Sequence, residues 1–582
     1  MLAATIFGSS IAFIEASVIN VALPAIQHGL RASVREMQWI ASIYTLLVAS
    51  LTLTSGSAGD RFGRLRVFAL GLGIIAAASV VAGCVVTGTQ LVVARALQGM
   101  GAALLVPNSL ALLSAAFPKT ERGRAIGTWS AATAVTSAGG PILGGVFVDT
   151  LSWRAAFILI VPLALVALGV ALARVPEVRI GRRRPEIDWW GVGLATGGLA
   201  TLVFGLISLA GSGSALPAVV VGVALLLGFL WHEARTLSPM MPLRLFRSAT
   251  FLGANMLTLL LYFALGGAFF VLPFDLVRVH GYSATATGAA YLPFAALLGG
   301  LSRPAGSLAD RLGARAPLVA GPLVAAVGLL LLALPGAGGS YWTTFFPAMC
   351  VIGLGMAITV APLTSAVMGA VDEQEVGVAS GVNNTVARVA GVIAVAVFGV
   401  MALSIFGRTF SARLATLDLS PAVHAAMAVQ GGNLGDVLVP AAATVAEHAA
   451  IEEAVGQALV TAFRWVALLA ALLAAAGSLA AAVTVEAAPA RAPATGTAEV
   501  RCTHLELVHD VDPRTQGCAE CLRLGERWVH LRLCLSCGYV GCCDSSRRRH
   551  ATAHFWASAH PIVRSLEPGE TWRWCYVDEI AV

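Results

Sequence analysis

The chain has 582 residues, of which 58% are apolar and only 12% are charged, with a formal net charge of +6. Soluble globular proteins carry about 25% charged residues, so this composition excludes a chain that is soluble throughout. It also excludes intrinsic disorder, which requires the opposite balance of charge and hydrophobicity. The small positive charge is spread along loops and does not indicate nucleic-acid binding.

Fourteen mostly apolar segments are long enough to cross a bilayer as helices, each needing about 20 residues. Their approximate ranges are 4–23, 38–58, 67–87, 91–115, 127–148, 155–173, 191–210, 216–232, 251–274, 288–307, 318–334, 342–368, 381–405 and 459–483. The first lacks a basic leader and a small-residue cleavage site, which predicts a span and not a signal peptide. Pro293 interrupts the tenth. The predicted fold class is an all-α polytopic membrane protein with a small domain at its C-terminus.

Arginine and lysine gather in the second, fourth, sixth, eighth and tenth connections between these segments. Basic residues in short loops mark the cytoplasmic side, so the even connections and both termini are predicted to be cytoplasmic, in the plasma membrane. The longest connection, 406–458, then lies outside and is predicted to be partly helical.

A loop motif occurs twice. Residues 56–64 read G-S-A-G-D-R-F-G-R, and 306–313 read G-S-L-A-D-R-L-G, with Asp310 following Asp60 by 250 residues (310 − 60). The residues of interest in the two copies are Gly56, Asp60, Arg61, Gly63, Arg64, Asp310 and Arg311. Both copies follow the second span of a six-span group if 191–210 and 216–232 are a central insertion. The predicted arrangement is therefore 6 + 2 + 6, and a substrate site is expected between the halves at the bilayer midplane.

Three further stretches carry a family resemblance: E-A-S-V-I-N-V-A-L-P at 15–24, R-A-L-Q-G-M-G at 95–101, and G-P-I-L-G-G at 140–145. Together with the repeated loop, they resemble the fourteen-span drug:proton antiporter branch of the major facilitator superfamily over residues 1–485. The resemblance implies proton-coupled efflux of small drug-like or amphipathic compounds, with the proton gradient as driving force. It implies coupling or transport roles for Glu15, Asn20, Arg95 and Gln98. It also implies gating roles for the residues of the repeated loop and for Gly140, Pro141, Gly144 and Gly145.

Each of these residues can have a role in transport, as the resemblance implies, or an ordinary structural role. Glu15 lies nine residues before Pro24, near the middle of its span, where a carboxylate is costly unless it faces a cavity or a partner and takes up protons. The alternative places Glu15 near a helix end, reaching the headgroups. Arg95 can likewise be an arginine that snorkels to the membrane surface. The glycine run can be a kink and a packing surface, which is compatible with gating.

Other polar side chains fall inside the predicted spans, and some are expected to line the cavity: Trp39, Tyr44, Gln98, Asn108, Asn255, Asn383, Asn384 and Arg388. Asp275, at the outer edge of its span, is expected to be solvated.

The composition changes after residue 485. Residues 486–500 are rich in Ala, Pro and Thr and are predicted to be a linker. Eight of the ten cysteines then fall between Cys502 and Cys575, including two C-x-x-C pairs. On the reducing cytoplasmic side this pattern predicts tetrahedral zinc rather than disulfides, in a domain over 501–582.

This segment resembles the UBP-type zinc finger, which implies a small α+β fold with two to three zinc ions. The resemblance assigns one site to Cys518, Cys521, Cys542 and His550, and a second to Cys534, Cys537, His554 and His560. A third site would use Cys502, His504 and Cys575, with Asp578 standing where the family often has a cysteine.

One departure concerns the partner of this domain. Ubiquitin-binding members carry an arginine just after the position of Cys542, where this chain has Cys543 and Asp544. An acidic residue there speaks against ubiquitin, and the arginines at 547–549 are the remaining candidates for holding a carboxylate. The expectation is a regulatory module, or one that binds a cytoplasmic protein or peptide.

Two functions compete at this point. The first is a proton-coupled exporter of small molecules, and the alternative is a membrane-anchored binding or sensor protein whose zinc finger captures a cytoplasmic peptide or protein. Deleting 500–582 discriminates, because the first predicts surviving transport. An enzyme is not expected, since no nucleophile–base pair is recognisable and the ligand spacing is that of structural zinc sites, in which protein ligands fill every position.

Overall fold

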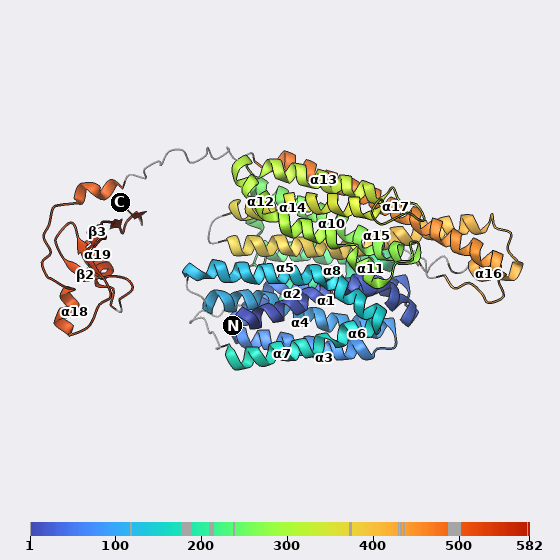
Figure 1. Cartoon of the computed structure of the whole chain (residues 1–582), viewed down its shortest axis with the longest axis horizontal. Helices are drawn as coiled ribbons and strands as arrows, with labels where there is room; N and C mark the ends of the chain where they lie inside the picture. The colour runs from blue at the N-terminus through green and yellow to red at the C-terminus, as the bar shows by residue number, and fades with distance from the viewer. Residues whose placement is uncertain are drawn as a thin grey trace. The chain divides into compact units, whose positions relative to one another are not determined.

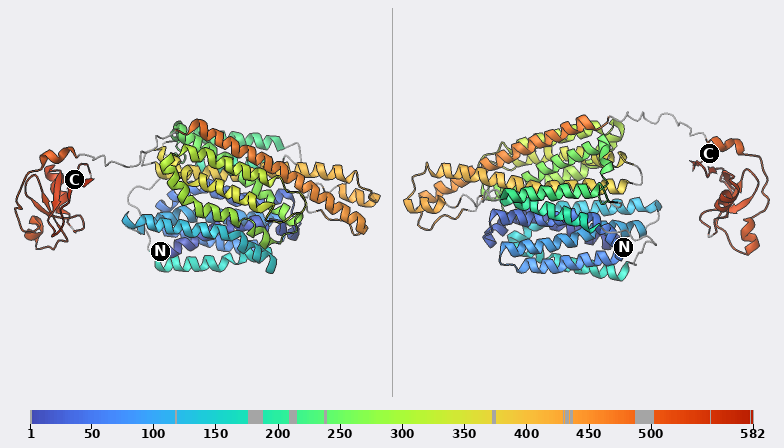
Figure 2. Two further views of the ribbon diagram at one scale, coloured as in Figure 1. Left: turned by 45° about the horizontal axis from the view of Figure 1, so that its top comes forward. Right: turned by 180° about the vertical axis from the view of Figure 1, so that it is seen from behind.

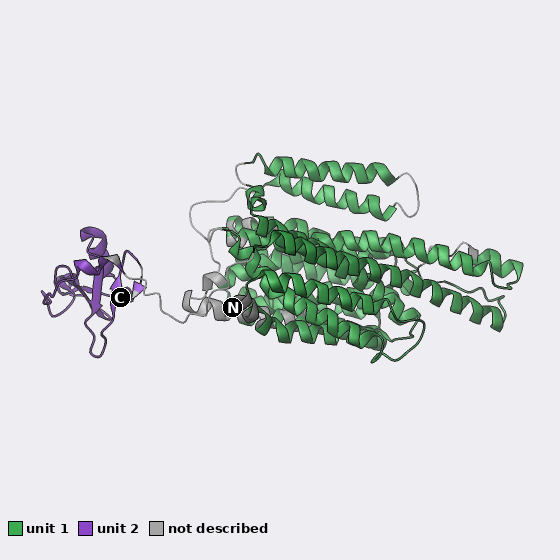
Figure 3. Cartoon of the chain, turned by 90° about the horizontal axis from the view of Figure 1, so that it is seen from above, with its two compact units in different colours: residues 1–491 green, residues 492–582 purple. Residues whose placement is uncertain are grey.

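The description rests on a computed structural model of the chain. It covers residues 2–116, 119–175, 188–208, 215–236, 239–371, 375–428, 430, 434, 437–486, 502–546, 548–578 and 580–581. At some helical positions, among them 56, 57, 60, 119–127 and 307–312, only the backbone is described. The chain forms two compact units, 1–491 and 492–582 (Figure 3).

The first part of unit 1 is a helical bundle. Its helices are α1 (Leu2–Leu30), α2 (Val34–Phe62), α3 (Arg64–Cys84), α4 (Gly88–Ala116), α5 (Lys119–Thr150), α6 (Trp153–Ile158) and α7 (Ile160–Arg174). Helix α4 packs against α2 and α3, and α1 packs against α5. Apart from α2 and α5, these helices are mostly apolar in sequence, as expected for helices that face protein and lipid instead of water.

A second bundle follows a central pair, α8 (Trp189–Ser208) and α9 (Leu216–Glu233), whose two helices pack on each other. The second bundle contains η2 (Leu243–Arg247), α10 (Ala249–Arg278), α11 (Ala284–Ala289), α12 (Leu292–Leu312), α13 (Arg315–Leu332), α14 (Phe345–Gly369), α15 (Val376–Leu414), α16 (Pro421–Ala428) and α17 (Val445–Thr484). Helix α14 packs against α12 and α13 as α4 packs against α2 and α3, which is the pairing expected of two repeats (Figure 1).

Every predicted span falls on a helix or a pair of consecutive helices. Twelve helical segments among the described residues are long and apolar enough to cross a membrane. The remaining two predicted spans, 38–58 and 127–148, lie within α2 and α5, which have 29 and 32 residues but carry more polar side chains. The predicted interruption at Pro293 is also present, because α11 ends at Ala289 and α12 begins at Leu292 with Pro293 in its first turn.

The predicted long connection, 406–458, is largely helical. Helices α15 and α17 continue to Leu414 and back from Val445, beyond the predicted span ends, and α16 lies between them. In Figure 1 the three form the part of unit 1 that projects past the ends of the other helices. A capping box starts α17, in which Thr444 and Glu447 satisfy each other's backbone N–H groups.

The two copies of the loop motif adopt the same turn. Gly63 separates α2 from α3 with φ of +106°, and Gly313 separates α12 from α13 with φ of +80°. Side chains with a Cβ are strained at such angles, which explains why both copies have glycine there. The backbone therefore repeats where the sequence repeats.

Unit 2 is a small α+β domain. Its elements are η3 (Thr503–Leu507), α18 (Ala519–Leu524), β1 (Leu531–Cys534), β2 (Val540–Cys542), α19 (His550–Ser558), β3 (Ile562–Ser565), β4 (Arg573–Cys575) and β5 (Ile580–Ala581). The strands form an antiparallel sheet in the order β2-β1-β3-β4-β5. Its apolar core is small, and Leu533, Val540 and Ile562 are its fully buried aliphatic residues. Such a core stabilises a domain of this size only marginally, so metal binding is expected to contribute.

Candidate functional site

Glu15 is buried in the middle of α1. Its side chain is 2% exposed, and it faces α3 and α4, not the ends of the helix. The Oε1 atom accepts hydrogen bonds from Gln98 Nε2 at 2.7 Å and from Ser79 Oγ at 3.0 Å. Gln98 Nε2 also donates to Ser79 Oγ at 2.9 Å, which closes a triangle of three polar side chains.

Arg95 joins this cluster from one turn earlier on α4. Its Nη1 donates to Gln98 Oε1 at 3.0 Å, and its Nε donates to the Ile40 carbonyl at 3.4 Å. The guanidinium lies over the ring of Tyr44, with Cζ 4.3 Å from the ring centroid. Arg95 is fully buried, so its charge is not carried to the surface by snorkelling. Gln98 thus bridges a carboxyl group and a guanidinium inside the bundle.

Two atoms of the cluster lack a hydrogen-bond partner among the described residues. They are Glu15 Oε2 and Arg95 Nη2, both of which have almost no solvent exposure. Buried polar atoms are usually paired, and an unpaired ionised group in the bundle is costly. A bound proton would remove the charge of the carboxyl group, and a rearrangement that brings Oε2 and Nη2 together would pair both atoms.

The four residues predicted for coupling are not all brought together. Glu15, Arg95 and Gln98 meet, whereas Asn20 lies five residues further along α1, on another face, and is half-buried. Ser79 and Tyr44 complete the cluster. Ser79 was not predicted from the sequence to belong to the site. A lone serine within the apolar run of 74–82 is the signal that would have pointed to it.

The glycine run on α5 forms a close contact with two other helices. A methyl group on Gly140 would overlap Ser17 Oγ, and one on Gly144 would lie 2.6 Å from Val18 Cγ1, so α1 packs directly against α5. A methyl group on Gly145 would overlap the Ala284 carbonyl of α11, and one on Gly288 would overlap the Pro141 carbonyl. The run thus joins the two halves of unit 1.

Asp149 strengthens that junction at the end of α5. Its carboxylate accepts backbone N–H groups of Ala284 at 3.0 Å and Thr285 at 2.7 Å, at the start of α11. Backbone hydrogen bonds to a carboxylate at a helix start are charge-assisted and strong. The first half therefore caps a helix of the second half.

The loop motif is described only in part. Arg64 Nη1 donates to the Ala111 carbonyl of α4 at 2.9 Å, and Arg61 is exposed. A methyl group on Gly59 would overlap Asn108 Oδ1, so α2 and α4 approach closely there. Side chains at the remaining predicted gating positions, Gly56, Asp60, Asp310 and Arg311, lie outside the described residues.

The expectation that Asp275 is solvated is wrong. Its side chain is 3% exposed, and Oδ2 lies 3.5 Å from Nε2 of the equally buried His280. The reason is that the chain after α10 folds back at Gly281, so the segment that carries His280 covers the end of the helix.

Unit 2 brings its cysteines and histidines into three groups. In each group, one ligand atom from every residue lies within 4.8 Å of the others. The members are Cys518, Cys521, Cys542 and His550; Cys534, Cys537, His554 and His560; and Cys502, His504, Cys575 and Asp578. These are the three sets that the resemblance implied.

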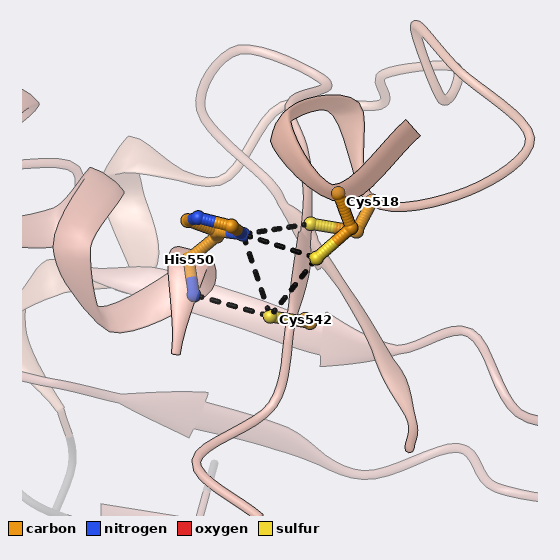
Figure 4. A group of neighbouring side chains, drawn as sticks. Cys518, Cys542 and His550 are labelled. Carbon is orange, nitrogen blue, oxygen red and sulfur yellow. Dashed lines mark hydrogen bonds between the residues drawn. The ribbon is translucent and has the colours of Figure 1, made fainter. Parts of the chain in front are cut away.

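The first group has the size of a tetrahedral zinc site (Figure 4). His550 Nδ1 lies 3.2 Å from Cys518 Sγ and 3.3 Å from Cys521 Sγ, and the Sγ atoms of Cys521 and Cys542 are 3.9 Å apart. Zinc with Zn–S bonds of about 2.3 Å requires sulfurs about 3.8 Å apart in a tetrahedron. The residues therefore fit the ion.

Asp578 belongs to the third group. Its Oδ2 lies 2.9 Å from His504 Nδ1 and 3.4 Å from Cys575 Sγ. Hydrogen bonds from Cys502 and His504 lower the pKa of the Asp578 carboxyl, which keeps it in the anionic form that a metal requires. Aspartate is an accepted zinc ligand, so the substitution leaves the set chemically competent.

Asp544 is engaged inside the domain. Its Oδ1 accepts a hydrogen bond from Thr552 Oγ1, which also lies 3.3 Å from the Tyr576 hydroxyl. Arg548 pairs with Glu526 at 2.9 Å, and Arg547 lies outside the described residues. Arg548 is therefore held by a carboxylate of its own chain, and Asp544 is bound to a side chain of α19.

Comparison with known proteins identifies both units. The Major Facilitator Superfamily model matches residues 5–395, and the model described as a Zn-finger in ubiquitin-hydrolases and other proteins matches 518–582. The chain therefore belongs to the major facilitator superfamily, a class of multi-pass membrane transporters, and carries a UBP-type zinc finger at its C-terminus.

The relatives include named export and resistance proteins. One is the tetracenomycin C resistance and export protein of Streptomyces glaucescens, 32% identical over 72% of this chain and 78% of the relative. Another is the multidrug resistance protein Stp of Mycobacterium tuberculosis (strain CDC 1551 / Oshkosh), 33% identical over 68% of this chain and 74% of the relative.

Among solved structures, a bacterial homologue of the human lysosomal transporter Spinster, in an inward-facing and unoccupied conformation, matches with a TM-score of 0.61. It is 16% identical and covers 84% of this chain and 98% of its own, which supports the fold.

Proposed function

We propose that this protein is a proton-coupled antiporter that exports small drug-like or amphipathic compounds from the cell. Relatives named for export, multidrug resistance and puromycin resistance support efflux as the direction. The observation that supports coupling is the environment of Glu15, a carboxyl group 2% exposed in a membrane-spanning bundle, one oxygen of which has no partner among the described residues.

The cluster offers a physical route to coupling. When Glu15 holds a proton, the neutral carboxyl needs no counter-charge, and Arg95 keeps its contacts with Gln98, Ile40 and the Tyr44 ring. When the proton leaves, the buried carboxylate needs the guanidinium, and the atoms without partners, Oε2 and Nη2, are those that would meet. Because that movement draws α1 towards α4, proton binding and helix position depend on each other.

The glycine run supplies the matching conformational element. On α5 it joins the halves through α11, with Asp149 as a carboxylate cap. We place this junction at the external end and both termini in the cytoplasm, since the basic connections lie on the other side. In this scheme residues 1–485 are the transport domain, 486–500 a linker, and 501–582 a cytoplasmic zinc domain.

The zinc domain holds three ions in this proposal, one per ligand group, and they act structurally. All four positions of each group are occupied by protein ligands, which leaves no open position for catalysis. A bound ion would fix β2, α18 and α19 relative to one another. Asp544 and the Arg548–Glu526 pair favour a protein or peptide partner other than ubiquitin.

The test of coupling is Glu15→Gln in proteoliposomes with an imposed pH gradient. Glutamine retains an oxygen that accepts from Ser79 and Gln98 but cannot exchange a proton. A gradient of two pH units supplies about 2.7 kcal/mol per proton, which is about hundredfold accumulation of ethidium at one proton per cycle. We expect the variant to show no accumulation above the gradient-free level while ethidium counterflow persists.

Matched variants sharpen that test. Glu452→Gln, at a side chain 69% exposed on α17, is expected to transport normally. Proton-driven accumulation by Glu15→Gln at the wild-type level would disprove the coupling role. Removing 500–582 is expected to leave efflux intact, and its loss in a correctly inserted protein would favour the binding-protein alternative.

A further inference from the structure

An apolar cavity of about 280 Å³ lies between the central pair α8–α9 and the main bundle. Fourteen of its seventeen lining residues are apolar. Both halves contribute, with Ala49 from α2, Met256 from α10 and Val386 from α15, while Ala195 and Phe229 come from the central pair. The central pair thus creates a cavity that neither half possesses by itself. In Figure 2 (right) α8 and α9, coloured teal to green, lie along the boundary of the two halves.

The cavity opens to the side of unit 1. Leu252 and Met256, which line it, are 42% and 40% exposed, in contrast to the fully buried Leu257 and Leu261 on the same helix. The outer face of α9 is apolar and exposed, as Leu227 at 60% shows. An opening surrounded by such side chains faces lipid. It lies along the first third of α10, at the end opposite the α5–α11 junction.

The lining includes one buried amide side chain, that of Asn255. Asn255 is 3% exposed and donates from Nδ2 to the Phe251 carbonyl at 2.9 Å, and its Oδ1 accepts from Asn383 at 3.2 Å. Asn383 also donates to Thr258 Oγ1 at 2.7 Å and lines a second, more polar cavity of about 120 Å³. An amide oxygen can accept two hydrogen bonds, so Asn255 Oδ1 retains one free acceptor position.

The lining also selects by charge. Besides Asn255, the polar lining residues are Ser50 and Thr385, and none of the seventeen is ionisable. A charged ligand would therefore lose its hydration without gaining a partner, which is costly. A volume just under the 300–1,000 Å³ of typical small-molecule sites fits a compact molecule of one or two rings.

We propose that this cavity binds a small, uncharged, largely apolar molecule bearing one hydrogen-bond donor, which enters from the membrane side and donates to Asn255. The inference deepens the proposed export function, for it identifies a site where neutral substrates are taken from the lipid. A membrane acyl chain is the competing occupant. An acyl chain has no hydrogen-bond donor for Asn255 Oδ1.

Photolabelling tests the site directly. The probe is 4-(hydroxymethyl)benzophenone, a neutral two-ring molecule with one hydroxyl donor, and benzophenones react readily with methionine, which lines the cavity at 240, 241 and 256. The full chain is placed in nanodiscs of phosphatidylethanolamine and phosphatidylglycerol and irradiated, and adducts are mapped by mass spectrometry. We expect adducts at Met256 to saturate and to be displaced by diphenylmethanol, and adducts at the lipid-facing Leu227 to rise linearly.

Variants separate the ligand site from general labelling. Ala195→Trp fills the cavity and should abolish the saturable adducts, whereas Leu227→Trp, on the outer face of α9, should leave them. Asn255→Leu should weaken half-saturation about fivefold, as expected for one hydrogen bond, and should not affect 4-methylbenzophenone, which lacks the donor. A Met256 adduct that grows linearly, or that oleic acid displaces while diphenylmethanol does not, would overturn the proposal.

The labelling requires no transport, so the two proposals fail separately. Saturable labelling in a protein without proton-driven efflux would leave the site standing and refute the transport proposal. Linear labelling in an active antiporter would refute only the site.

Discussion

Replacing Gln98 by leucine tests whether Glu15 and Arg95 act as one unit. The Gln98 amide makes three hydrogen bonds, to Glu15, Ser79 and Arg95, at 2.7, 2.9 and 3.0 Å. Hydrogen bonds between helices in lipid contribute about 0.6 kcal/mol each, so the loss of three accounts for about 2 kcal/mol. Leaving a second guanidinium nitrogen of the buried Arg95 unpaired adds about 1–3 kcal/mol. The expected destabilisation is therefore about 3–5 kcal/mol.

A double-mutant cycle isolates the bridging role. In Gln98→Leu with Arg95→Leu no guanidinium remains to be satisfied, so the double change should cost about 1–3 kcal/mol less than the sum of the single changes. The assay is reversible unfolding in mixed SDS micelles, followed by helicity. Gln90→Leu is the control on the same helix, where an exposed amide accepts a hydrogen bond from the Val86 N–H.

The outcome against this reasoning is additivity. If the two single changes add within about 0.5 kcal/mol, Gln98 does not transmit the state of Glu15 to Arg95. A destabilisation no larger than that of Gln90→Leu would show the same.

Three further results are expected. Metal analysis of the full chain should find three zinc ions per chain, falling to two in Asp578→Ala; a value near zero in the wild type would refute the zinc assignment. Chelation should expose 502–582 to protease while efflux continues, because the ions stabilise unit 2 alone. Gly145→Val should separate α5 from α11 and so raise maleimide labelling of a cysteine placed at Thr285. Gly139→Val is the control, because Gly139 has open space around it and its replacement should not raise the labelling. Equal labelling in both variants would show that the junction does not gate.

Much of the fold follows from chain-local physics. Apolar stretches of about 20 residues must become helices in lipid because their backbone groups have no other partners, so the spans could be predicted. The equivalence of the two loop motifs could also be predicted, because the positive φ at Gly63 and Gly313 strongly favours glycine at both positions. Zinc chemistry restricts cysteine and histidine equally strongly, and the three ligand groups match the family pattern.

Other features depended on which helices meet. Ser79 is one small polar residue in an apolar span, and only the packing of α1, α3 and α4 shows that it donates to Glu15. Asp275 sits at a helix end, where solvation is the usual outcome, until the following segment covers it with His280. Asp149 becomes a cap because α11 of the other half begins beside it. The partners are 64 residues apart for Glu15 and Ser79, 5 for Asp275 and His280, and 135 for Asp149 and Ala284. No regular spacing in the sequence indicates any of these pairings.

The distribution of charged and apolar residues along the sequence by itself determined that lipid surrounds most of this chain and that water surrounds its C-terminal end. Hydrophobicity and metal-ligand chemistry act on each segment separately, so composition and spacing carry them. Tertiary structure alone decided that Glu15 and Arg95 share Gln98, that α5 packs against α11, and that α8 and α9 enclose an apolar cavity whose lining includes Asn255. These depend on the relative rotation and depth of whole helices, which are set by side-chain packing across the bundle.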